Sequence, residues 1–158
     1  MKEATHPNGA AKAQMSLDRT LTYRMHLLHK LTDQESQRLY PSELGLSLSD
    51  GRCLAAVGSF EPLSVNRLAQ LANLNKGQAS RAAQYLVDQG LVAKADTAGD
   101  ARGVELTLTP RGRKAWQKTM EFIHRRNEEI FGGLTPQERR LLGDLFDRLI
   151  DHHRSSAP

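Results

Sequence analysis

Residues 63–109 read LSVNRLAQLANLNKGQASRAAQYLVDQGLVAKADTAGDARGVELTLT, and this stretch decides the fold. Ser64 is placed to cap a short helix over the segment VNRLAQLA, in which apolar residues recur at helical spacing. Residues 73–75 then supply a tight turn, and a second helix is expected over residues 76–88, with Gly90 ending it. Two short helices joined by a turn of this length form a helix-turn-helix unit.

A β-hairpin is predicted directly after this unit. Residues 91–95 form one short apolar stretch, and residues 104–109 alternate apolar with polar side chains, as half-buried strands do. The intervening residues 96–103 are polar and hold two glycines, as expected of a hairpin tip. A helix-turn-helix followed by such a hairpin is a winged helix-turn-helix, so we expect a mainly α fold with a small β wing.

Helices are also predicted on both sides of this core. One runs over residues 16–39, where Tyr40-Pro41 should break it, and another begins at the Ser47 cap and ends near Gly58. Two more begin at Thr109-Pro110 and Thr135-Pro136, because threonine caps a helix and proline suits its first turn. The expected organisation is a disordered lead-in (1–14), a single domain (15–153) with its winged core over 47–109, flanking helices over 16–39 and 110–152, and a tail (154–158).

Composition narrows the class of protein. The chain has 158 residues, of which 39% are apolar and 25% charged, and this balance is typical of a globular domain. Aromatic residues make up only 5%, which favours helix-on-helix packing over a large sheet. Cys53 is the single cysteine, so an internal disulfide and a multi-cysteine zinc site are excluded. With no apolar stretch long enough to span a membrane and no signal peptide at the N-terminus, we expect a cytoplasmic protein. No cofactor is expected.

The helix over residues 76–88 has the features of a DNA-reading helix. Its core side carries Ala79, Ala83 and Leu86, and its opposite side carries small or hydrogen-bonding residues. Arg81 could reach guanine O6 and N7, and the free amides around Lys76 suit a phosphate. A solvated helix face in any other protein has a similar composition, so the helix alone does not decide the function.

The hairpin tip adds a second indication. Asp100 and Arg102 flank the tip, and an arginine on a narrow wing can enter the minor groove of A·T-rich DNA. Asp100 could steer that arginine through an ion pair. The other interpretation is an ordinary surface turn that happens to hold one arginine.

Three motifs in this region resemble the winged-helix core of the MarR family of transcriptional regulators. They are the junction Leu86…Gly90-Leu91-Val92, the D-x-R tip of Asp100 and Arg102, and the closing LT-x-x-G of Leu108-Thr109-Pro110-Arg111-Gly112. The resemblance spans residues 16–152. Lys94 departs from it where the family often has arginine, and Gly51 departs from it where many members carry a large aromatic residue and so leaves room near the second helix.

The resemblance implies a homodimer, joined through the first helix and the last two, that binds a pseudo-palindromic operator in double-stranded DNA. An apolar stripe on the last helix (Leu141, Leu145, Phe146 and Leu149) supports a dimer independently, because it is too large to leave in water. The expected DNA-binding residues are Ser64, Lys76, Gly77, Gln78, Ser80, Arg81, Gln84, Lys94, Asp100 and Arg102.

Members of this family commonly respond to small aromatic acids or phenols, which implies a repressor released by such an effector. Arg24 lies within the apolar stripe of the first helix, where it needs a ligand carboxylate or an intersubunit salt bridge. His26, His29 and Arg52 complete the expected ligand pocket, and no metal is expected there. A looser resemblance to regulators of nicotinic-acid catabolism, in MSLDRTLTYR, GLSLSDGRCLAA and ANLNKGQASRAAQ, implies 6-hydroxynicotinate as the effector.

Two other functions stay open at this point. Cys53 could make the protein a thiol-based redox regulator, although its place between Arg52 and Leu54 favours an inert buried thiol. A winged helix can also serve only for dimerisation or protein contact, but that predicts an apolar or acidic second helix. An enzyme is not expected, because the chain has no GxSxG, glycine-rich phosphate loop or HExxH motif.

Overall fold

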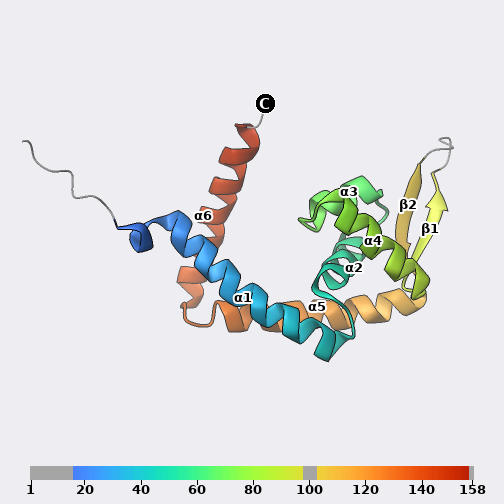
Figure 1. Cartoon of the computed structure of the whole chain (residues 1–158), viewed down its shortest axis with the longest axis horizontal. Helices are drawn as coiled ribbons and strands as arrows, with labels where there is room; N and C mark the ends of the chain where they lie inside the picture. Colours follow the sequence, from blue (N-terminus) through green and yellow to red (C-terminus); the bar gives the residue numbers. More distant parts are fainter. Residues whose placement is uncertain (1–15, 98–102, 157–158) are drawn as a thin grey trace, which may run out of the picture. The chain divides into compact units, whose positions relative to one another are not determined.

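The computed structural model describes residues 16–97 and 103–156 as helices joined to one hairpin (Figure 1). The chain divides into two compact units between Ser36 and Gln37, and each unit is described by itself. The elements in chain order are a 3-10 turn η1 (Leu17–Arg19), α1 (Leu21–Leu44), α2 (Leu48–Phe60), α3 (Val65–Leu71), α4 (Lys76–Asp88), β1 (Val92–Asp96), β2 (Val104–Leu108), α5 (Pro110–Ile130) and α6 (Pro136–Ser155).

This order confirms the predicted mainly α fold with a β wing. β1 and β2 pair antiparallel, from Val92 opposite Leu108 to Asp96 opposite Val104. Leu63 forms an isolated bridge to Leu106, with backbone hydrogen bonds in both directions. The hairpin is therefore extended on its β2 side by one residue of the segment that precedes α3.

Local capping explains where the helices begin. The side chains of Ser47, Ser64, Asn75, Thr109 and Thr135 each accept a hydrogen bond from a backbone N–H three residues later. Asn75 and Thr135 form full capping boxes, since Gln78 and Glu138 return hydrogen bonds to the cap residues' N–H groups. Each such cap stabilises a helix by about 1 kcal/mol.

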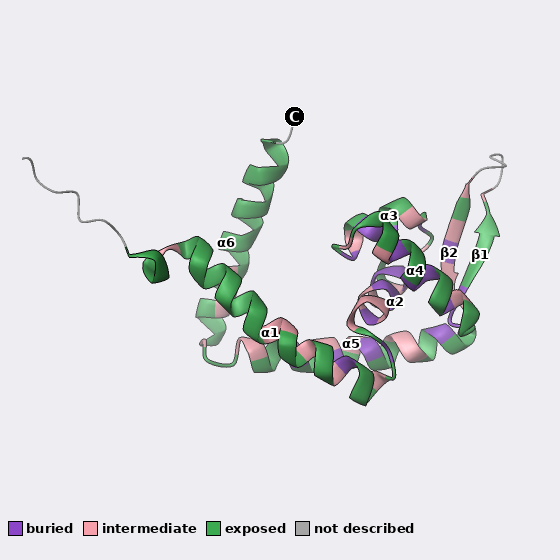
Figure 2. Cartoon of the chain, viewed as in Figure 1, coloured by how far each residue is buried: buried purple, intermediate pink, exposed green. Residues whose placement is uncertain are grey.

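The hydrophobic core lies among α2, α3, α4 and the base of the hairpin (Figure 2). Leu54, Leu68, Leu86 and Leu106 come from these four parts and are each 0% exposed. Small residues on the inner face of α4 (Ala79, Ala82 and Ala83) let this helix pack closely on α2 and α3. Burial thus fixes which face of α4 is left at the surface.

The prediction that Pro41 ends the first helix is wrong. α1 continues through Pro41 to Leu44, and Gly45, with φ +68°, follows its last residue. Tyr40 is buried and packs edge-on against Phe122, with ring centroids 4.8 Å apart. The burial of Tyr40 and its contact with Phe122 stabilise this turn and oppose the roughly 3 kcal/mol that an interior proline costs a helix.

Tyr40 also accounts for Gly51. A Cβ atom on Gly51 would lie 2.4 Å from two ring carbons of Tyr40, so the room left by this glycine is filled by that ring.

Three further helix bounds differ from the prediction. η1 precedes α1, which begins at Leu21 instead of Ser16; α2 ends at Phe60 instead of Gly58; and α6 continues to Ser155, past the expected end of the last flanking helix at residue 152. Among the described residues, no helix is long and apolar enough to cross a membrane.

Candidate nucleic-acid interface

The exposed face of α4 begins at a tightly capped N-terminus. Asn75 Oδ1 accepts a hydrogen bond from the N–H of Gln78 (2.8 Å), and Gln78 Oε1 accepts one from the N–H of Asn75 (3.2 Å). Gln78 is one of the residues expected to bind DNA, but its side-chain oxygen takes part in the cap and its side chain is half-buried. The next residues on this face, Ser80 and Arg81, are exposed.

Arg81 lies beside the first turn of α4. A Cβ atom on Gly77 would lie 3.4 Å from Arg81 Nη1, so the guanidinium reaches back along the helix toward Gly77. Lys76 and Gly77 are exposed at this same turn. The structure thus brings a lysine, an arginine and the N-terminal end of a helix dipole together, and this combination suits phosphate and base edges.

Gln84, one turn further along α4, has both ends of its amide engaged. Its Oε1 accepts a hydrogen bond from Lys94 Nζ (2.8 Å), and its Nε2 donates to Asp88 Oδ1 (2.7 Å). Lys94 lies on β1, so this chain of hydrogen bonds joins the helix to the hairpin. Asp88 was missed by sequence reasoning, and its only local signal is its i,i+4 spacing from Gln84.

The β2 side of the hairpin is held by Glu61, another residue that sequence reasoning missed. Its carboxylate accepts a hydrogen bond from the Leu108 N–H (2.6 Å) and forms an ion pair with Arg113 of α5. Burial alone would raise the pKa of Glu61, but the hydrogen bond from Leu108, with the hydrogen bond and charge of Arg113, lowers it below its ordinary value. No sequence pattern links Glu61 to residues about fifty positions away.

The remaining predicted contacts fall near the ends of the motif. Ser64 is exposed and caps α3 by accepting from the Arg67 N–H (3.1 Å). At the outer end of the hairpin, Thr97 donates its N–H to the Gly103 carbonyl (2.9 Å). Asp100 and Arg102 lie outside the described residues, so their role at the tip stays a prediction.

The expected ligand pocket draws its residues from both units of the chain. Arg24, His26 and His29 are exposed on α1, in the unit that ends at Ser36. Arg52 is half-buried on α2, in the other unit. The four-residue pocket therefore stays a prediction. No cluster of metal-ligating side chains occurs in the ranges 16–97 and 103–156.

Arg52 has a buried aromatic neighbour. Burial raises the pKa of Tyr40, and the charges of Arg52 and Arg126 oppose this rise. Arg126 is itself buried on α5 and forms an ion pair with Glu129 (2.7 Å). Sequence reasoning missed this buried arginine, because the helical pattern of α5 does not distinguish it from its exposed neighbours.

Cys53 is poorly suited to redox sensing. It is 0% exposed, and burial, reinforced by the charge of Asp50, raises its pKa to about 12. Since the thiolate is the reactive form, this cysteine is almost wholly in its unreactive form near neutral pH. The geometry thus favours the inert thiol over the redox alternative.

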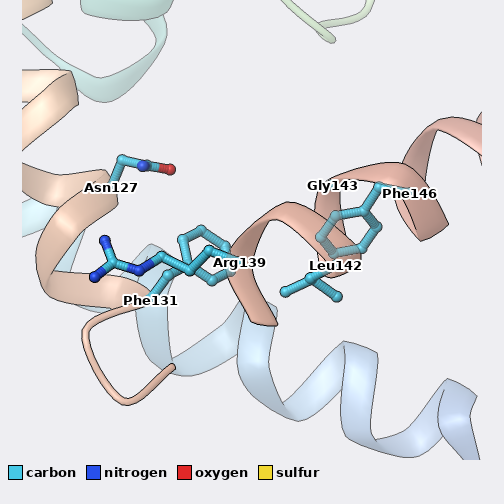
Figure 3. Close-up of a pocket in the computed structure, with 6 residues that line it drawn as sticks. All are labelled: Asn127, Phe131, Arg139, Leu142, Gly143 and Phe146. Atoms are coloured by element: carbon cyan, nitrogen blue, oxygen red, sulfur yellow. The ribbon is translucent and has the colours of Figure 1, made fainter. Parts of the chain in front are cut away.

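Two of the cavities among the described residues lie away from the start of α4, where Lys76 and Arg81 are exposed. One, of about 260 Å³, lies between the C-terminal end of α4 and α5, where Tyr85, Gln89, Arg111 and Lys118 are among its lining residues. The other, of about 170 Å³, lies between α5 and α6. Figure 3 shows its lining: Asn127, Phe131, Arg139, Leu142, Gly143 and Phe146.

Arg139 connects the two helices beside the second cavity. It forms an ion pair with Glu128 and donates a hydrogen bond to the Leu134 carbonyl (3.3 Å). The cavity opens among apolar side chains that continue along α6. These contacts anchor the start of α6, while most of the helix has its apolar side chains exposed.

Comparison with known proteins gives consistent matches. A model of the MarR family matches residues 44–103. The HTH-type transcriptional regulator BilQ of Clostridium symbiosum is 26% identical over 105 residues, which cover 66% of this chain and 73% of BilQ.

Solved structures extend the likeness over nearly the whole chain. A MarR family transcriptional regulator from Silicibacter pomeroyi has 26% identity and a TM-score of 0.76, with 89% of this chain and 94% of that chain covered. Bordetella bronchiseptica BpsR, whose DNA binding is regulated by 6-hydroxynicotinic acid, has 20% identity and a TM-score of 0.76, with 91% of this chain and 99% of that chain covered. At this identity, the likeness to BpsR concerns the fold.

Proposed function

The chain belongs to the MarR family of transcriptional regulators, and we propose that it is a homodimeric repressor released from its operator by a small aromatic acid. The observation that carries this proposal is the exposed surface of α4. The helix is capped at its start and packs on the core through its alanines, so Lys76, Ser80 and Arg81 are exposed next to a hairpin that hydrogen bonds hold in place. Two copies related by a two-fold axis would read two half-sites about one turn of DNA apart.

Lys76 and Gly77 are assigned to phosphate contact, and Ser80 and Arg81 to base edges. A positively charged helix start approaches the backbone, while a guanidinium matches guanine O6 and N7. Arg102 is assigned to the minor groove, with Asp100 steering it. Replacement of Arg102 by alanine should then weaken operator binding and leave the dimer intact.

Dimerisation is supported by the exposed apolar face of α6. Leu141, Leu145, Phe146, Leu149 and Ile150 are each between 41% and 58% exposed. An apolar strip of this length on one helix is typical of an interface. α1 carries a similar set, with Leu21 79% and Leu31 56% exposed. We assign both helices, with α5, to the contact between subunits.

The effector is proposed to be an aromatic carboxylate, with 6-hydroxynicotinate as the first candidate. This choice is supported by the fold shared with BpsR and by the cations available to hold a carboxylate. Arg24, with His26, His29 and Arg52, is the first candidate site. The cavity beside α4 is a second one, because Arg111 and Lys118 line it and none of its described lining residues is acidic.

The test begins with selection of bound fragments from genomic DNA, with and without 6-hydroxynicotinate. We expect a pseudo-palindromic site that is enriched only without the acid. Failure to enrich any sequence would contradict the regulator, and enrichment unaffected by any aromatic acid would contradict the release mechanism. Arg81→Ala should relax the base preference of the selected site, whereas a uniform loss on all DNA would limit Arg81 to phosphate contact.

Calorimetry then locates the effector. Titration of 6-hydroxynicotinate into wild type, Arg24→Ala and Arg111→Ala compares the two candidate sites directly. Loss of binding in Arg24→Ala alone supports the predicted pocket, and loss in Arg111→Ala alone moves the site to the cavity beside α4. Equal binding by all three proteins would reject both sites.

A further inference from the structure

We propose that Lys94, Gln84 and Asp88 form a side-chain tie that sets the angle of the hairpin against α4, so that Gln84 positions the wing instead of reading a base. This inference rests on the proposed use of α4 and the hairpin in DNA binding. It assigns Gln84 and Lys94 a different role from the direct contacts expected from sequence.

The hydrogen bonds of Gln84 oppose a role in base recognition. A glutamine that recognises adenine uses its carbonyl oxygen and its amide nitrogen together. In Gln84 the oxygen accepts from Lys94 Nζ (2.8 Å) and the nitrogen donates to Asp88 Oδ1 (2.7 Å). A base contact would have to replace both bonds. Asp88, one turn away on α4, orients the amide so that its oxygen faces the hairpin.

The strand register explains why Lys94 reaches α4. Lys94 is paired with Leu106, and directly opposite residues place their side chains on the same face of a hairpin. Leu106 is 0% exposed and Val92, two residues before Lys94, is 2% exposed, so this face is the one that covers the core. A lysine here keeps its stem along apolar surface and extends its ammonium group to the edge, where Gln84 accepts it.

The tie holds the β1 strand of the hairpin, whereas Glu61 holds the β2 strand. The β2 strand is anchored by the Leu63 bridge and by the Glu61 carboxylate at Leu108. On the β1 side, the Lys94–Gln84 bond is a side-chain link to α4. Rotation of the hairpin about its base would lengthen this link. The two anchors together therefore set the direction in which the strands leave the core.

A double-mutant cycle on operator binding tests the tie. Gln84→Ala and Lys94→Met, which keeps the lysine stem, should each weaken binding by about 3–10-fold, and the double variant should be no weaker than the poorer single variant. The salt dependence of binding should stay that of wild type. A direct phosphate contact by Lys94 would instead lower the salt slope by about one, and a base contact by Gln84 would confine its effect to one base pair. Additive losses, or either of these two patterns, would overturn the tie.

Matched controls separate the tie from general loss of charge. Lys76→Met removes a proposed phosphate contact and should lower the salt slope, whereas Lys114→Met removes an exposed charge from α5 and should leave affinity near that of wild type. Lys94→Arg keeps a donor at this position and should restore most of the affinity that Lys94→Met loses.

A readout in the free protein keeps the test independent of DNA. The side-chain amide resonances of Gln84 in NMR spectra should move in Lys94→Met and return toward their original position in Lys94→Arg. Unchanged resonances in Lys94→Met would overturn the tie. If wild type bound no DNA sequence, the proposed function would fail, while these spectra would still decide whether the tie exists.

Discussion

The two halves of this chain differ in how completely each one buries its own apolar surface. In the half formed by α2, α3, α4 and the hairpin, Leu54, Leu68, Leu86 and Leu106 are each 0% exposed. The other half is represented by α6, in which no residue is buried, although this helix is as strongly amphipathic as α5. The first half buries its apolar side chains within one chain, whereas α6 leaves its apolar side chains exposed, where a second surface could cover them.

This difference in burial corresponds to the two roles proposed for the chain, DNA binding by α4 and dimerisation by α6. The α4 surface is set by contacts within one chain, so its geometry should persist without a partner. α6 has a capping box and an apolar face but buries little, and its helical order in solution would depend on packing against a second surface. The comparison therefore predicts that variants in the two halves fail in different ways.

The largest expected effect comes from α6. Leu145→Glu combined with Phe146→Glu places two charges in the exposed apolar face, and we expect the proposed dimer to dissociate and operator affinity to fall by at least ~100-fold. Light scattering during size-exclusion chromatography measures the first effect and fluorescence anisotropy the second. Arg140→Glu, on the opposite side of the same helix, is the matched control and should remain dimeric. A double variant that stayed dimeric would remove α6 from the interface.

Gly51→Ala should destabilise the other half from within. The new methyl group would lie 2.4 Å from the Tyr40 ring, and overpacking of this kind costs about 1–3 kcal/mol. Denaturant unfolding measures the loss. Tyr40→Leu in the same chain removes the ring and should recover part of the stability of Gly51→Ala, so the two substitutions should be strongly non-additive. Additive losses would show that the ring does not account for this glycine.

Sequence reasoning succeeded where the deciding interactions are local. Helix starts at Ser47, Ser64, Asn75 and Thr109 depend on hydrogen bonds across three residues, and those are visible as spacings in the sequence. The alternation along residues 104–109 likewise predicted a strand, which the structure has as β2. Boundaries and face assignments in the winged core could therefore be predicted closely.

The failures involve contacts between distant residues. Pro41 reads locally as a helix breaker, and the helix continues because Tyr40 packs on Phe122, eighty-two positions away. The partners of Glu61 and the bond between Lys94 and Gln84 depend on the final arrangement of strands and helices. Residue type and periodicity carry no signal for such pairs, so the sequence alone predicts a separate DNA contact for Lys94 and for Gln84.

Glu61→Gln should have a moderate effect on the base of the hairpin. The variant keeps an oxygen for the Leu108 N–H but loses the charge that pairs with Arg113, and because the Arg113 side chain is 51% exposed we expect a loss of about 1 kcal/mol. The folded-state pKa of Glu61 is lowered, so its contribution to stability is present above the unfolded pKa of about 4.3 and is lost as the pH falls through the folded value. Unfolding curves of wild type and variant should therefore differ at neutral pH and converge under acidic conditions. A constant difference down to low pH would show that the charge does not contribute.

Cys53 should give the smallest effect of all, because it lies within the half that is complete in one chain. Its thiol is 0% exposed, so peroxide or a thiol reagent cannot reach it in the folded protein. Its pKa is raised to about 12, so almost none of it is the reactive thiolate at neutral pH. We expect operator binding to be unchanged by peroxide, and labelling by a chromogenic disulfide reagent to proceed only as fast as the protein unfolds. Cys53→Ala provides the control, since any peroxide effect that persists in it comes from another residue. Rapid labelling of the folded wild type, with loss of operator binding that Cys53→Ala does not show, would reinstate the redox function and imply that the core around α2 opens far more readily than its burial indicates.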